Sequence, residues 1–216
     1  MAADVEFSLI ETILWTRSSG YVLLQYHLRR LVASAECMGF ACDSGEIVRT
    51  LQSCAENLSA EPSWKIRLLL APGGTLSTSA IPIELPSHKD PLLRAVISTT
   101  AVSSADPILR HKTTRRALYD AELKTWSART GCFDVLFVNE RAEVTEGART
   151  SVFIQRGAEM LTPPLECGLL DGTLRRWMLD SQAMRTRESV LTVSDLASAD
   201  RVFLGNSVRG LVEVRL

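Results

Sequence analysis

The sequence lacks an excess of charge of either sign. Its 24 Lys and Arg residues nearly balance its 25 Asp and Glu residues, which leaves a formal net charge of -1 at pH 7. A protein that holds nucleic acid or an anionic membrane surface needs a broad basic field. We therefore expect neither nucleic acid nor a membrane as a partner, and any anion that binds must be held by a local site.

Cysteines are few, and long apolar runs are absent. The five cysteines are odd in number and never form a C-x-x-C pair, so they predict neither a disulfide framework nor a zinc site, and we expect no metal. The apolar runs are far shorter than the ~20 residues that a membrane helix requires. The first six residues carry acids where a signal peptide would carry bases. These features favour a soluble, cytoplasmic protein.

The order of periodic segments predicts an α+β fold. Hydrophobic and β-branched residues predict strands near 5–15, 21–24, 65–70, 75–85, 93–99, 135–139, 150–155, 159–161, 189–193, 201–204 and 211–215. Apolar residues at helical spacing predict helices near 24–38, 44–58, 114–129 and from 173 onward, and Gly39 is expected to end the first. The short strands of the second half suggest a closed or barrel-like domain.

The best candidate for a linker is the segment 100–107, which is small, polar and ends at Pro107. Gly, Ser, Asp and Pro in such runs mark loops between periodic segments. We therefore place a domain boundary near Asp106. This division predicts a small N-terminal α/β domain over residues 1–105 and a barrel-like C-terminal domain over residues 106–216.

Two charged residues could carry chemistry. Lys112 follows the linker, and a lysine desolvated at a domain junction can form a covalent bond with a carbonyl compound. Its arginine-rich surroundings equally suit a solvated basic cluster. Glu146 lies between two predicted strands with a glycine after it. It is either a buried carboxylate that needs a partner or an exposed turn residue.

Two loops could hold an anion through backbone N–H groups and hydroxyls. Asp171, Gly172, Thr173 and Leu174 open a predicted helix, and residues 205–207 (GNS) follow a predicted strand. Helix N-termini and turns that expose successive N–H groups bind phosphate. The alternative for Asp171 is an ordinary helix cap.

Taken together, six motifs resemble those of the fold-type IV pyridoxal-phosphate enzymes, which comprise the class IV aminotransferases and 4-amino-4-deoxychorismate lyase. Their order and spacing match over about half of the chain, and residues 7–12 (FSLIET) and 27–31 (HLRRL) extend the resemblance to nearly all of it. The motifs are HKTTRR at 111–116, FDVLFVN at 133–139, VTEG at 144–147, LTPP at 161–164, GLLDGTLR at 168–175 and GNSVRG at 205–210.

The resemblance implies a D-amino-acid-aminotransferase-like fold, pyridoxal 5'-phosphate as cofactor, and a role for seven residues. Lys112 matches the lysine that binds the cofactor covalently, and Glu146 matches the acid that bonds the pyridine nitrogen. The other five residues match positions that bind the cofactor phosphate in the family. They are Arg30, Thr173, Leu174, Asn206 and Ser207. Because Arg30 lies beside the apolar stripe of its helix, we expect its loss to leave stability almost unchanged.

Departures from the family pattern guide the choice of reaction. Many class IV aminotransferases carry a tyrosine shortly after the lysine, whereas Arg116 and Ala117 stand here, as in the lyase subgroup. The resemblance therefore implies a lyase that releases pyruvate from 4-amino-4-deoxychorismate to give 4-aminobenzoate for folate biosynthesis. The alternatives are an aminotransferase acting on a small amino acid and a non-catalytic family remnant.

The resemblance also implies partners. The family's sites lie at a dimer interface, which implies a homodimer and a small-molecule amino substrate. The chain starts at the FSLIET strand, as does the lyase-like domain fused to aminodeoxychorismate synthase, and that synthase is a further candidate partner. This start leaves open whether the substrate pocket is complete.

Overall fold

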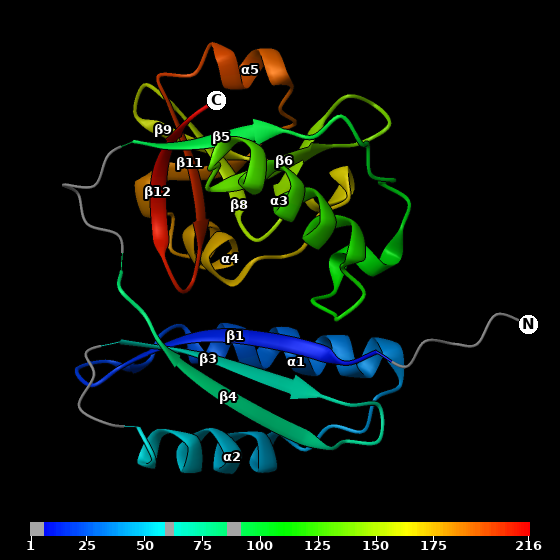
Figure 1. The fold of residues 1–216 in the computed structure, drawn as a ribbon, viewed down its shortest axis with the longest axis vertical. Coiled ribbons are helices and arrows are strands. Elements are labelled where there is room, and N and C mark those ends of the chain that lie inside the picture. Colours follow the sequence, from blue (N-terminus) through cyan, green and yellow to red (C-terminus); the bar gives the residue numbers. More distant parts are fainter. Residues whose placement is uncertain (1–6, 59–62, 86–91) are drawn as a thin grey trace, which may run out of the picture. The chain divides into compact units, whose positions relative to one another are not determined.

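The computed structural model describes residues 7–58, 63–85 and 92–216. These residues form two compact units, each with its own hydrophobic core (Figure 1). The first unit contains the described residues up to Leu85 together with His111–Arg115. The second contains those of Pro86–Arg110 together with Arg116–Leu216. Among the described residues, no helix combines the length and hydrophobicity that crossing a membrane requires.

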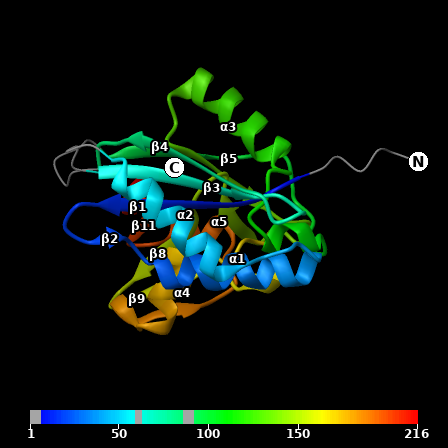
Figure 2. The same ribbon diagram turned by 90° about the horizontal axis from the view of Figure 1, so that it is seen from below.

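The first unit is an antiparallel sheet with two helices on one face. The sheet has the order β2-β1-β3-β4, with β1 at Leu9–Thr16, β2 at Gly20–Tyr21, β3 at Ser63–Leu70 and β4 at Leu76–Pro82. Helices α1 (Leu24–Met38) and α2 (Ser44–Glu56) lie across the sheet (Figure 2). Side chains from both helices and from β1 and β3 form one core.

The second unit is a closed, mixed barrel, which confirms the expected α+β fold with a barrel-like part. Its sheet has the order β10-β9-β8-β11-β12-β5-β6-β7, and a further pairing of β7 with β8 closes it. The strands are β5 (Leu93–Ile97), β6 (Asp134–Val138), β7 (Val144–Gly147), β8 (Ser151–Arg156), β9 (Glu159–Thr162), β10 (Thr186–Glu188), β11 (Arg201–Asn206) and β12 (Gly210–Arg215).

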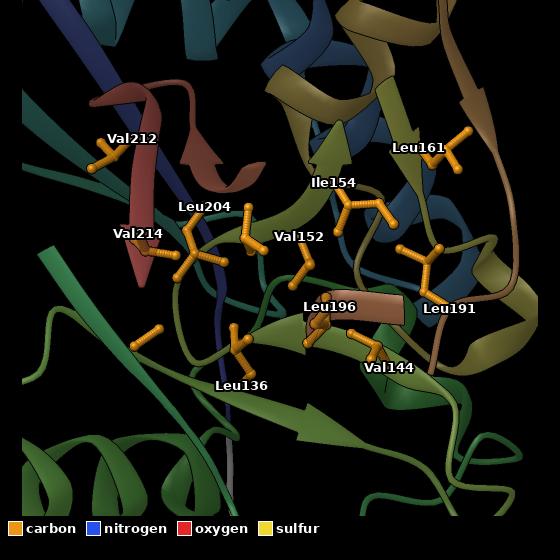
Figure 3. Packing of buried hydrophobic residues seen from close by; sticks show 12 residues of the cluster. Leu136, Val144, Val152, Ile154, Leu161, Leu191, Leu196, Leu204, Val212 and Val214 are labelled. Atoms are coloured by element: carbon orange, nitrogen blue, oxygen red, sulfur yellow. The ribbon is translucent and has the colours of Figure 1, made fainter. Parts of the chain in front are cut away.

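Helices α3 (Ala117–Thr130), α4 (Thr173–Asp180) and α5 (Val193–Ala197) complete the second unit, with short 3-10 helices at Pro107–Arg110, Leu165–Cys167 and Ala183–Arg185. Leucine and valine side chains from the strands point toward one another and fill its core (Figure 3). Leu191 and Leu196, from the segment around α5, pack into the same cluster. Because this core holds the strands together, it also holds the strand ends from which the loops project.

The compact units divide the chain earlier than the boundary expected near Asp106. Strand β5 precedes that position, yet it pairs in parallel with β6 and β12 of the barrel. In the other direction, residues 111–115 belong to the first unit because their backbone bonds to the start of β1. The N–H of Ile10 donates to the carbonyl of Lys112 over 2.8 Å. The small polar residues at 100–107 therefore mark a loop within the second unit.

Several short elements differ from those expected. The strand expected at 21–24 ends at Tyr21, and α1 already begins at Leu24. The strand expected at 189–193 is absent from that described segment, because α5 begins at Val193 and the nearby strand β10 occupies Thr186–Glu188. The first two residues of the strand expected over 5–15 lie outside the described residues.

Candidate active site

In the first unit, a buried carboxylate fixes the orientation of Arg30. Glu11 lies on β1 between Leu9 and Ile13, on the face that packs against the helices, and its residue is 1% exposed. Arg30 on α1 donates from Nε to Glu11 Oε1 over 2.8 Å and from Nη2 to Oε2 over 2.6 Å. His27, one turn earlier on α1, lies with Nδ1 2.6 Å from the same Oε2. Two elements thus meet through a two-pronged ion pair.

The charges in this cluster follow from burial and from the partners. Burial raises the pKa of Glu11, but Arg30 and His27 outweigh that effect and bring it to about 2. Burial lowers the pKa of His27, and the positive charges of Arg30 and Lys112 lower it as well. The charge and hydrogen bond of Glu11 raise it, but the net shift is downward. We therefore assign His27 as neutral at pH 7, donating through Nδ1–H to an ionised Glu11.

This pairing corrects the expectation that Arg30 contributes little to stability. The apolar stripe of α1 places Leu31 and Ala35 in the core, and Arg30 does lie beside it. Its guanidinium, however, compensates the charge of Glu11, whose side chain is 2% exposed. Removing one partner of a buried ion pair leaves the other charge uncompensated.

Lys112 lies in the loop between the first 3-10 helix and α3, in the segment that belongs to the first unit. It is half-buried. Thr113 next to it pairs with Leu9 at the start of β1. On the other side, the Nδ1 atom of His111 lies 2.9 Å from the hydroxyl of Ser34 on α1. The loop is therefore fixed to both elements of the Glu11 cluster, and the first unit brings Lys112 and Arg30 to the surroundings of His27.

In the second unit, Glu146 is a buried residue of a strand and not an exposed turn residue. It lies on β7 and is 9% exposed. The hydroxyl of Tyr119 donates to its Oε1 over 3.2 Å, and the N–H of Leu170 donates to its Oε2 over 3.3 Å. The glycine that follows, Gly147, is required because a Cβ there would lie 2.7 Å from Oδ2 of Asp134.

Ser151 is the point at which the other expected site residues of this unit meet. It pairs across the barrel closure with Glu146 and on its other side with Gly205, the residue before Asn206. A Cβ on Gly172 would lie 2.5 Å from the hydroxyl of Ser151. Thr173 and Leu174 follow Gly172 as the first residues of α4. Three backbone segments that are distant in the sequence are thereby held side by side.

This arrangement has the form of an anion cradle, which fits a phosphate group. Gly172 is the N-cap of α4 and brings no side chain, so the first turn of the helix presents backbone N–H groups. Gly205 allows an equally close approach, because a Cβ there would lie 2.8 Å from a methyl group of Leu174. Thr173 and Ser207 are buried hydroxyl residues at the same edge. The residues present therefore fit the phosphate of pyridoxal phosphate.

Asn206 shapes its loop through its own side chain. Its Oδ1 accepts from the N–H groups of Val208 and Arg209, both over 3.0 Å, and its Nδ2 donates to the carbonyl of Arg149 over 3.1 Å. The side chain thus closes the turn that carries Ser207. Because the side chain is used in this way, the predicted contribution of Asn206 to phosphate binding would come from its backbone N–H.

The acid beside the cradle is compensated by arginines. Asp171 accepts from Nη1 of Arg175 over 3.0 Å and from Nε of Arg176 over 2.9 Å. Arg175 is fully buried and also donates to the carbonyl of Pro163. The carboxylate of Asp171 therefore adds little repulsion toward an anion.

Sequence reasoning missed Glu11 and Tyr119. A glutamate in line with Leu9 and Ile13 on one strand face was a usable signal, since a charge at a core position needs a partner. Tyr119 follows Lys112 by seven residues, beyond the positions where the family's tyrosine is expected. Its contact with Glu146, 27 residues away, depends on the packing of α3 against the barrel.

Comparison with known proteins gives one family over nearly the whole chain. The model of the family Amino-transferase class IV matches residues 8–216. A curated protein named "Putative aminodeoxychorismate lyase" from Schizosaccharomyces pombe is 28% identical over 207 residues, which are 94% of this chain and 87% of that protein.

Solved structures share the fold. A structure of a "Putative amino-acid aminotransferase" from Mesorhizobium loti is 37% identical, with a TM-score of 0.90, and the match covers 98% of this chain and 100% of that one. A Mycobacterium tuberculosis structure described as "A hypothetical aminotransferase", in an "alpha-ketoglutarate and PMP bound form", is 25% identical, with a TM-score of 0.81 over 99% of this chain and 82% of that one.

Proposed function

Because this chain belongs to the class IV aminotransferase family, whose cofactor is pyridoxal phosphate, we propose that it is a lyase releasing pyruvate from 4-amino-4-deoxychorismate to give 4-aminobenzoate. The observation that supports the proposal is the convergence of Glu146, Gly172 and Gly205 on Ser151, which leaves a cradle suited to a phosphate in the same unit as a buried carboxylate. The lyase-named relative aligns over most of both chains.

Each residue has a proposed task. Arg30, Thr173, Leu174, Asn206 and Ser207 hold the phosphate, and Glu146 keeps a proton on the ring nitrogen. When bound, the cofactor supplies an electron sink for the bond that breaks next to the amino-bearing carbon. The amine of Lys112 would hold the cofactor covalently and would take the proton from the amino-bearing carbon of the substrate.

The residue at position 116 supports the lyase over an aminotransferase. Arg116, four residues after Lys112, donates through Nη2 to the carbonyl of Ala148 over 2.6 Å and through Nε to Asp120 over 2.8 Å. Many aminotransferases of the family have a tyrosine near this position, and Arg116 offers no phenol to the cofactor. The proposal includes a cytoplasmic homodimer and a partner that aminates chorismate, as in aminodeoxychorismate synthase.

An aminotransferase acting on a small amino acid is the second candidate. It is favoured by the Mesorhizobium loti structure, which is 37% identical over 98% of this chain and the whole of that one. The two reactions use the same residues up to removal of the proton, and they differ in whether a carbon–oxygen bond breaks or the proton returns elsewhere. The chemistry of the products therefore separates them.

The first experiment locates the covalent site. Purified protein is incubated with pyridoxal phosphate, reduced with borohydride and mapped by peptide mass spectrometry. We expect the label on Lys112, and we expect Lys112→Ala to carry none while the exposed Lys124→Ala is labelled like wild type. A label on Lys65, Lys89 or Lys124 would contradict the assignment.

The second experiment identifies the reaction. The protein is given 4-amino-4-deoxychorismate, and pyruvate and 4-aminobenzoate are measured with and without an added keto acid. Release of both products without a keto acid supports the lyase, and Lys112→Ala should abolish it. Amino-group transfer that requires the keto acid would replace the lyase by the aminotransferase.

A further inference from the structure

Tyr119 is a buried tyrosine whose ring and hydroxyl have separate environments. It lies in the first turn of α3 and is 9% exposed. Its ring packs edge-on against Phe137 of β6, with ring centroids 4.6 Å apart. Packing alone would be satisfied by phenylalanine, since a buried hydroxyl is costly unless it has a hydrogen-bond partner. Packing therefore explains the ring of Tyr119 but not its hydroxyl.

That hydroxyl donates to Glu146. The Oη atom lies 3.2 Å from Oε1, while the N–H of Leu170 reaches Oε2 over 3.3 Å. Each carboxylate oxygen thus receives a donor from a different element, α3 on one side and the loop before α4 on the other. Two donors on opposite oxygens fix the rotation of the carboxylate plane.

The surroundings keep Tyr119 a donor. Burial raises the pKa of Tyr119, and the charge and hydrogen bond of Glu146 raise it further. Asp106 adds to this effect and Arg116 opposes it. The phenol is therefore protonated throughout the neutral range, so its hydroxyl can donate to Glu146 at any pH at which the enzyme would work.

We propose that Tyr119 is a positioning residue that holds the Glu146 carboxylate in the orientation needed to keep a proton on the cofactor's ring nitrogen. This rests on the proposed function, in which Glu146 meets that nitrogen. Glu146 can stabilise a proton on the ring nitrogen best if its carboxylate is already aligned with that nitrogen. A group that is aligned before the reaction does not have to reorient during the chemical step. Tyr119 supplies that alignment from seven residues after Lys112.

The test is a double-mutant cycle of Tyr119→Phe and Glu146→Gln in the cofactor-loaded protein. The direct readout is the ¹⁵N resonance of bound pyridoxal phosphate labelled at its ring nitrogen, which reports protonation without turnover. The second readout is cofactor affinity, and the third is the separation of kcat from KM. Tyr21→Phe is the matched control, because Tyr21 also donates a hydroxyl, to the carbonyl of Leu51 over 2.6 Å.

We expect Tyr119→Phe to move the ¹⁵N resonance part of the way toward that of Glu146→Gln. Cofactor affinity should stay within about threefold of wild type, and kcat should fall about tenfold with little change in KM, as for the loss of one hydrogen bond to a charged group. In the Glu146→Gln background, Tyr119→Phe should change neither the resonance nor kcat further, because the two residues act as one unit. Tyr21→Phe should change neither.

Three results would each contradict one part of the proposal. If Glu146→Gln moves the resonance and Tyr119→Phe does not, the positioning role is excluded while the proposed function stands. If the two substitutions have fully additive effects on the resonance and on kcat, Tyr119 does not act through Glu146. If Glu146→Gln itself leaves the ring nitrogen protonated, the role of Glu146 in the proposed function fails instead.

Discussion

Glu11 in the first unit and Asp134 in the second are both carboxylates with almost no exposed surface, 1% and 0%, yet their surroundings differ in charge. Glu11 meets the guanidinium of Arg30 and its pKa falls to about 2. Asp134 accepts from the hydroxyl of Thr150 and from the N–H of Val135, and burial raises its pKa although these bonds and the nearby charge of Arg149 act in the opposite direction. Equal burial therefore gives opposite shifts, and the guanidinium that bonds directly to Glu11 decides the direction there.

Glu146 resembles Asp134 in the kind of donors that reach it. Tyr119 and Leu170, which donate to it, are neutral donors, as are the hydroxyl and N–H groups that reach Asp134. A hydroxyl and an N–H bring no formal charge to the carboxylate that they reach, whereas the guanidinium of Arg30 brings a positive charge to Glu11. The arrangement at Glu11 therefore suits an acid that orients an arginine.

The largest effect should come from breaking the charged pair. Arg30→Ala leaves the Glu11 carboxylate without its guanidinium, so we expect the free energy of unfolding of the cofactor-free protein to fall by about 3–5 kcal/mol. Urea unfolding at pH 7 measures it. The control is Arg29→Ala, because Arg29 is exposed and stacks over Tyr26 at 4.4 Å, which should cost at most about 1 kcal/mol. Equal losses in the two variants would contradict the role assigned to Glu11.

The second effect concerns acid. Glu11 has a pKa of about 2 in the folded protein against an ordinary value of 4.5, so its stabilising contribution is present above pH ~4.5 and disappears as the pH falls toward 2. The shift corresponds to about 3 kcal/mol. His27 also makes the folded protein less stable as the pH falls below about 6.5. Its pKa is lowered in the folded protein, so the unfolded chain takes up the proton first.

Surface carboxylates such as Glu140 and Asp195 also have lowered pKa values. The share of Glu11 is therefore the difference between the wild type and Glu11→Gln in urea unfolding from pH 7 to pH 2. We expect the two curves to converge below pH ~4.5. Parallel curves over the whole range would show that the pKa of Glu11 is the same in the folded and the unfolded protein.

Long elements with local signals were predictable. Helix α1 ends at Met38 with Gly39 at φ 69°, as its apolar spacing and the following glycine indicate. Residues 189–193 were not predictable in this way. Their β-branched composition favours a strand, but Thr192 and Asp195 form a capping box that starts α5. A local cap outweighs β propensity here because its two hydrogen bonds satisfy backbone groups at once.

The candidate site was predictable as a set of residues but not as a set of contacts. Motif order located Lys112, Glu146 and the two loops, whose roles toward the cofactor stay predictions. The pairing of Glu11 with Arg30 depends on the packing of α1 on β1, and that of Tyr119 with Glu146 depends on the packing of α3 on β6 and β7. Neither is encoded by spacing within one element.

The smallest effect should come from removing one neutral donor in the second unit. Thr150 is 4% exposed, and its hydroxyl donates to Asp134 over 2.6 Å. Thr150→Val keeps the shape and removes this bond, so we expect a loss of about 1–2 kcal/mol at pH 7. Because the bond stabilises the ionised form of Asp134, whose pKa burial raises, the loss should shrink in acid as Asp134 takes up its proton.

The matched control is Thr162→Val. Thr162 is fully buried in the same unit, and its hydroxyl donates over 2.8 Å to the carbonyl of Val152, which does not titrate. Urea unfolding at several pH values should therefore give a cost for Thr162→Val that does not vary with pH, beside one for Thr150→Val that does. If both costs are constant, Asp134 keeps one protonation state across the range. The contrast between a carboxylate held by a cation and one held by neutral donors would then rest on Glu11 alone.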